Sequence, residues 1–143
     1  MTDGSAVPAG QSPPAAATVA DLMRPALTTA ELDDHAAAAA YLMKHAGTTA
    51  LMVLDPHTEQ PIGIITETDI THAVADGKDV NNVRLRDLMT PQPTVITTTT
   101  SVRDAATLMT RSHFRHLPVV GDDGLVGMVD ISDICRALIG PSS

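Results

Sequence analysis

The chain has 143 residues, of which 43% are hydrophobic and 18% charged, a composition typical of a globular protein. Seventeen acidic and nine basic side chains give a formal charge of −8. This excess of acid argues against a nucleic-acid-binding surface, which requires clustered Lys and Arg. The single cysteine, Cys135, excludes an intramolecular disulfide and a cysteine-based zinc site.

Nothing in the chain predicts contact with a membrane or secretion. The longest apolar run, at residues 36–43, is far shorter than the roughly 18 residues of a membrane span. The first residues carry neither the basic stretch nor the apolar stretch of a secretory signal. We therefore expect a cytoplasmic protein that binds neither a membrane nor nucleic acid.

The chain consists of a tail and two copies of one unit. Residues 1–17 are rich in Ala, Pro, Gly and Ser without any helical or strand period, which predicts a disordered tail. The segment DLMRP at 21–25 then returns as DLMTP at 87–91, and GIITETD at 63–69 returns as GMVDISD at 127–133. These matches divide the chain into a tail, two repeats at 18–79 and 80–140, and three final residues at 141–143.

Each repeat predicts the element order β-α-β-β-α. A short extended piece, at 27–29 or 94–97, follows the proline that ends the opening segment. An amphipathic helix comes next, capped by Ser101 in the second repeat and by Asp33 or Asp34, ahead of an alanine run, in the first. Two strands follow, at 50–54 and 62–65 or at 117–120 and 125–129, and a closing helix ends near Gly77 or Gly140.

The predicted fold class is α/β, with two β-α-β-β-α repeats packed sheet to sheet about a pseudo-two-fold axis. About 60 residues bury too little apolar surface to be stable alone, so each repeat needs the other. The chain contains only one Tyr, one Phe and no Trp, so Leu, Val, Ile, Met and Ala must supply the core.

One polar motif stands in both repeats where the last strand meets the last helix. The first residues of a helix offer free N–H groups and a positive dipole end to a phosphate, and the Thr66 hydroxyl adds a donor. The carboxylate three residues later, Asp69, can accept from both hydroxyls of a ribose, and Asp133 is its counterpart. The same residues also fit helix caps, with Thr66 and Asp69 forming a capping box and Asp130 acting as an N-cap. The motif alone leaves both interpretations open.

These residues resemble a known family. Two copies of the pattern G-h-h-[ST]-x-x-D, each preceded by an LPVV-like strand (LMVL at 51–54, LPVV at 117–120) and opened by D-L-M-x-P, closely resemble the tandem cystathionine β-synthase (CBS) domain, or Bateman module. The resemblance extends over about residues 19–139. Its separate motifs are short, and their order and duplication make it specific.

The resemblance implies a regulatory adenosine-binding module and not an enzyme, with no catalytic and no metal-binding residues. Residues at the positions of the family's ligand-binding motifs are then candidates for ribose, phosphate and adenine contacts. They are Asp69 and Asp133 for the ribose, Thr66, Asp130, Arg115, His116, Thr49 and Ala50 for the phosphate region, and Thr99 for the adenine pocket.

Two departures from the family pattern predict unequal sites. Asp130 stands where the family has Ser or Thr, and its charge disfavours a polyphosphate; the first repeat has Thr49 and Ala50 where the second has Arg115 and His116. We therefore expect one competent site with Thr66 and Asp69, completed by Arg115 or His116 of the other repeat. The second site is expected to be weak, or selective for a nucleoside, a cationic adenosyl compound or a magnesium-bridged nucleotide.

The expected function is ligand sensing. The candidate ligands are AMP, ADP, ATP and S-adenosylmethionine, and no cofactor is required. The resemblance also implies a homodimer, and an unknown effector protein must read the signal. The alternative is a constitutive structural or interaction scaffold, in which the two motifs serve only as helix caps and no ligand binds.

Overall fold

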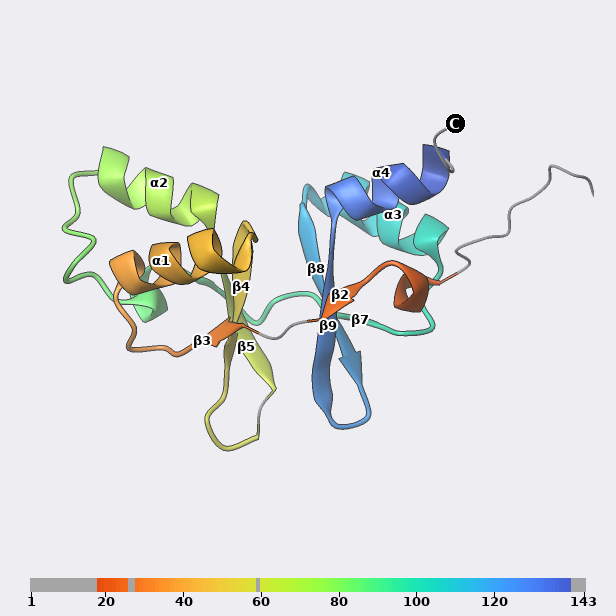
Figure 1. The fold of residues 1–143 in the computed structure, drawn as a ribbon, viewed down its shortest axis with the longest axis horizontal. Helices are drawn as coiled ribbons and strands as arrows, with labels where there is room; N and C mark the ends of the chain where they lie inside the picture. Colours follow the sequence, from red (N-terminus) through yellow and green to blue (C-terminus); the bar gives the residue numbers. More distant parts are fainter. Residues whose placement is uncertain (1–17, 26–27, 59, 140–143) are drawn as a thin grey trace, which may run out of the picture.

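The computed structural model describes residues 18–25, 28–58 and 60–139. The predicted tail at 1–17 and the last residues lie outside this range. Two four-stranded sheets face each other in the middle of the molecule, and the helices cover their outer faces (Figure 1). This arrangement confirms the predicted packing of sheet on sheet.

Both halves have the predicted order of elements, and their bounds differ from the prediction by a few residues. The parallel pairs β3–β4 and β7–β8 and the antiparallel pairs β4–β5 and β8–β9 repeat the same topology. The first half comprises β3 (Thr29–Ala30), α1 (Ala36–Ala46), β4 (Ala50–Leu54), β5 (Pro61–Thr66) and α2 (Glu67–Ala75). The second comprises β7 (Ile96–Thr97), α3 (Val102–Ser112), β8 (His116–Gly121), β9 (Gly124–Asp130) and α4 (Ile131–Ile139).

The opening segments of the two repeats are exchanged between the halves. Each forms a 3₁₀ turn, η1 (Val19–Asp21) or η2 (Leu85–Asp87), and a two-residue strand, β2 (Arg24–Pro25) or β6 (Thr90–Pro91). Strand β2 pairs with β9, and β6 pairs with β5, so the sheet orders are β2-β9-β8-β7 and β3-β4-β5-β6. Each sheet therefore contains one strand from the other sequence repeat.

The apolar cores follow this exchange. Val19 packs in the second half with residues such as Leu117 and Ile134, and Leu85 packs in the first half with Leu51 and Ile65. A third cluster joins the facing sheets; its buried members are Ala50, Met52 and Ile64, with Leu54, Leu125 and Met128 packed against them. The two halves thus share segments as well as a surface.

The helix starts confirm one predicted cap and correct the other. Ser101 caps α3 and accepts the Asp104 N–H at 2.9 Å, as predicted. The predicted cap of α1 by Asp33 or Asp34 is wrong, because His35 occupies the N-cap without a side-chain hydrogen bond. Asp34 instead accepts from the Glu31 N–H, and Asp33 binds Arg86. The side chain of Cys135 is exposed on α4.

The motif begins with a glycine in both repeats, and in the second repeat there is no room for a larger residue at this position, Gly127. A Cβ built on Gly127 would lie 2.8 Å from the Arg24 carbonyl oxygen on β2, whereas one on Gly63 would meet only the flexible side chain of Met89. We expect Gly127→Ala to lower the free energy of unfolding by about 2 kcal/mol, because the β2 backbone must shift. Gly63→Ala should cost less, and urea unfolding of both variants measures the difference. Equal costs would contradict this account.

Candidate functional site

Two clefts of similar construction lie between the halves. The Thr66 cleft has a volume of about 280 Å³ and lies at the start of α2, and the Asp133 cleft has a volume of about 340 Å³ and lies at the start of α4. Their lining residues correspond through the sequence repeat: Thr66 to Asp130, Pro118 to Met52, and His116 to Ala50. Each cleft therefore combines the helix start of one repeat with the middle strand of the other.

The Thr66 cleft brings together residues that the sequence placed in one site. Thr66 and Thr68 stand at the start of α2. From the other repeat come His116, the first residue of β8, and Arg115 just before it. Apolar side chains complete the walls, among them Ile64, Phe114 and Pro118. A hydroxyl group, a guanidinium and an imidazole thus line one cleft together with apolar side chains.

Both motifs also make the caps that the structural interpretation predicts. Thr66 Oγ1 accepts the Asp69 N–H at 3.2 Å, and Asp69 Oδ2 accepts the Thr66 N–H at 2.9 Å, which completes a capping box. Asp130 Oδ1 accepts the Asp133 N–H at 2.8 Å, and Asp133 Oδ2 accepts the Asp130 N–H at 3.1 Å. The caps account for the residue types at these positions, while Thr66 and Asp130 still line the clefts.

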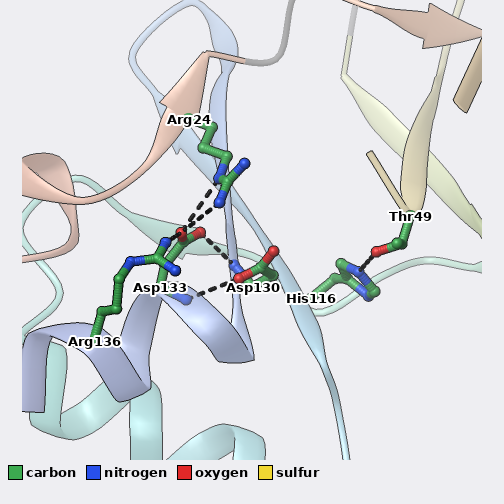
Figure 2. A network of polar contacts seen from close by, with 6 residues as sticks. All are labelled: Arg24, Thr49, His116, Asp130, Asp133 and Arg136. Carbon is green, nitrogen blue, oxygen red and sulfur yellow. Dashed lines mark hydrogen bonds and ion pairs between the residues drawn. The ribbon is translucent and has the colours of Figure 1, made fainter. Parts of the chain in front are cut away.

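Two arginines that the sequence reasoning missed hold Asp133. Arg24 of β2 donates to Asp133 Oδ1 from Nε at 3.2 Å and from Nη2 at 3.1 Å, and Arg136 of α4 donates to the same oxygen at 2.6 Å (Figure 2). The hydrogen bond to Asp133 raises the pKa of Arg24 above its usual value. Asp133 is 4% exposed, so its carboxylate is buried beneath these two cations.

His116 lies where the clefts adjoin. It lines the Thr66 cleft, the Asp133 cleft and a central cavity of about 280 Å³, which is also bordered by Thr49, Arg115 and Asp130. Its Nε2 is 2.8 Å from Thr49 Oγ1 of the first repeat (Figure 2). Burial lowers the pKa of His116 below its usual value of 6.5, so the ring is neutral at pH 7.

Four of the predicted site residues, described next, do not line the Thr66 cleft. Thr49 borders the central cavity and Ala50 lines the Asp133 cleft. Asp69 is half-buried and turned to the Thr66 N–H, and it does not line the Thr66 cleft. Thr99 is exposed, its hydroxyl oxygen 3.1 Å from that of Thr97, and it lines none of these three cavities.

Within residues 18–25, 28–58 and 60–139, no three His, Cys, Asp or Glu side chains come together in a way that could hold a metal ion. None of the helices in those same ranges is long and apolar enough to cross a membrane.

Comparison with known families explains the repeat. The model of the CBS domain matches the chain twice, at residues 19–76 and 85–140. The chain belongs to the CBS domain family. The CBS domain-containing protein CBSX3, mitochondrial, of Arabidopsis thaliana is 39% identical over 94 residues, which are 63% of this chain and 46% of that protein. An uncharacterized 17.7 kDa protein of Acidianus ambivalens is 36% identical over 125 residues, 87% of this chain and 70% of that protein.

The CBS pair also resembles solved structures over most of its length. The hexameric CBS-CP12 protein from bloom-forming cyanobacteria has a TM-score of 0.81 at 27% identity, covering 92% of this chain and 79% of that one. CBSX2 in complex with AMP has a TM-score of 0.70 at 28% identity, covering 86% and 96%. The CBS pair of protein MJ0100, in complex with 5′-methylthioadenosine and S-adenosyl-L-methionine, has a TM-score of 0.76 at 27% identity, covering 85% and 94%. The chain thus spans about half of its relative CBSX3 and nearly all of these last two structures.

Proposed function

We propose that this CBS pair is a regulatory sensor that binds an adenosine nucleotide in the Thr66 cleft and signals to a separate effector protein. The observation that carries the proposal is the meeting of Thr66 from one CBS repeat with Arg115 and His116 from the other around one cleft. A ligand held by both repeats changes how they pack on each other, and this is how binding is transmitted.

The walls of the cleft suit the parts of a nucleotide. Ile64, Phe114 and Pro118 offer apolar surface to a purine, and Arg115 offers a charge to a phosphate at the start of α2. Asp69 Oδ2 is engaged with the Thr66 N–H, so a ribose would use Oδ1 or draw the carboxylate away from its cap. The ligand class agrees with the AMP, 5′-methylthioadenosine and S-adenosyl-L-methionine bound to the two structural neighbours.

The proposal includes self-association. Exposed apolar side chains project from the outer helices, among them Val74 on α2 and Leu138 and Ile139 on α4, of which Ile139 is 82% exposed. We propose that these faces meet a second copy in a homodimer, although one structural neighbour is hexameric. The sensor would then be an assembly of CBS pairs, and the effector would read their arrangement.

A thermal-melt screen tests the sensing function. We expect AMP, ADP, ATP or S-adenosylmethionine to stabilise the protein, by about 2.7 kcal/mol when the ligand is at a hundred times its Kd. Arg115→Ala should reduce the shift caused by AMP, and Asp69→Ala should reduce the shift for every adenosine ligand. Arg111→Ala, which removes an exposed arginine of α3 outside the cleft, serves as the matched control.

Each variant is compared with itself without ligand, because Asp69→Ala also weakens a helix cap. No shift with any of these ligands would reject the sensor and favour the constitutive scaffold. A shift that survives unchanged in Asp69→Ala and Arg115→Ala would place the ligand elsewhere.

A further inference from the structure

The two clefts are equivalent by repeat but differ at the carboxylate that would meet a ribose. We infer that Arg24 occupies the place of the ribose in the Asp133 cleft, so that the two clefts fill in order, the Thr66 cleft first. The inference rests on the proposed function, because it assumes that the motif aspartates receive the ribose.

Both oxygens of Asp133 are already engaged. Oδ1 accepts from Arg24 and Arg136, and Oδ2 accepts from the Asp130 N–H (Figure 2). Hydrogen bonds between a guanidinium and a carboxylate are about twice as strong as those between neutral groups. The two hydroxyls of a ribose are neutral donors, so they cannot replace the arginines without a loss. A ribose reaches Asp133 only when Arg24, which lines the cleft, leaves.

The Thr66 cleft has no such competitor. When the two sequence repeats are aligned, Arg24 corresponds to Thr90 and Arg136 corresponds to His72. Within the described part of the chain, the carboxylate of Asp69 accepts one hydrogen bond, from the backbone N–H of Thr66. Among the described residues, the motif aspartate is therefore covered by arginines in the second repeat and by none in the first, where Asp69 is half-buried beside the Thr66 cleft.

Arg24 is held in a way that allows it to leave. Its side chain is 57% exposed, and it belongs to the two-residue strand β2 at the edge of its sheet. Swinging the guanidinium into water opens no internal cavity, and Arg136 remains on Asp133. The arginine thus lowers the affinity of the Asp133 cleft without closing it permanently.

Isothermal titration of the full chain with adenosine and with AMP tests the inference. The unsubstituted protein should bind one ligand per chain, in a manner that depends on Asp69. Arg24→Gln should bind a second adenosine, with an affinity at that site raised about tenfold or more, and adding Asp133→Ala should remove it. Arg24→Lys, which keeps the charge and loses the paired donors, should fall between the two. Arg86→Gln, which removes an arginine–aspartate pair with Asp33 outside the clefts, is the control.

The outcomes separate the two proposals. One site per chain in both the unsubstituted protein and Arg24→Gln would overturn the role of Arg24 and leave the sensor intact. Two equal sites in the unsubstituted protein, or weaker binding in Arg24→Gln, would overturn it as well. The absence of binding by either chain would overturn the proposed function, and the role of Arg24 with it.

Discussion

Leu85→Ala is expected to destabilise the half of the molecule that comes mainly from the other sequence repeat. Leu85 is fully buried in the core of the first half, against Leu51 and Ile65, although it opens the second repeat. Truncating a buried leucine costs about 2–5 kcal/mol. The Leu85 N–H also donates to the Asp34 carbonyl at 2.9 Å, which fixes the segment in place.

Urea unfolding measures the total loss, and hydrogen exchange of backbone amides locates it. Amides of β4 and β5 should lose at least as much protection as those of β8 and β9. Val95→Ala truncates an apolar side chain that is 39% exposed and lies outside the proposed dimer faces, and should alter stability by about 1 kcal/mol or less. A loss of protection confined to β8 and β9 would contradict the exchange of segments.

Asp133→Ala is expected to cost about 3 kcal/mol of stability, more than Asp69→Ala at the equivalent position. Both changes remove a cap, which is worth about 1 kcal/mol. Both also leave an N-cap N–H without its acceptor, that of Thr66 or that of Asp130. Asp133→Ala alone removes the charge-assisted bonds from Arg24 and Arg136. The two arginines are exposed enough to turn to water, which limits the loss.

Urea unfolding of the two alanine variants measures this difference directly. Arg24→Gln should cost less than Asp133→Ala, because Arg136 still pairs with the carboxylate. Equal costs for Asp69→Ala and Asp133→Ala would mean that the arginines add nothing to the cap.

The order of elements could be predicted from sequence because the repeat and its apolar periods report local structure. The exchange of β2 and β6 could not, since a two-residue strand has no period and the partner of Arg24 on β9 is Met128, far along the chain. The prediction of the α1 cap was wrong because it also depended on contacts with the other repeat. The first N–H groups of α1, at Ala36 and Ala37, donate to the carbonyls of Val83 and Val80 from the second repeat, so no carboxylate is needed as a cap.

The candidate site was predictable where it depended on the motifs and not where it depended on side-chain partners. Family positions indicated Thr66, Arg115 and His116, and these do share a cleft. Arg24 was overlooked because the two repeats differ there, Arg against Thr90, and because its partner is 109 positions away. The family position of Thr99 suggested the adenine pocket, but a sequence position does not fix the direction of a side chain. In the structure the Thr99 hydroxyl is close to that of Thr97 and outside the three cavities.

The exchange of opening segments also matters while the chain is being made. Strand β2 is made long before its partner β9, and the outer edge of β5 stays unpaired until β6 is made. Pairings this distant in sequence form slowly, and an unpaired strand edge is open to association. Because a second nascent chain can offer the same β9 edge to β2, two chains can trade these segments while keeping each strand contact.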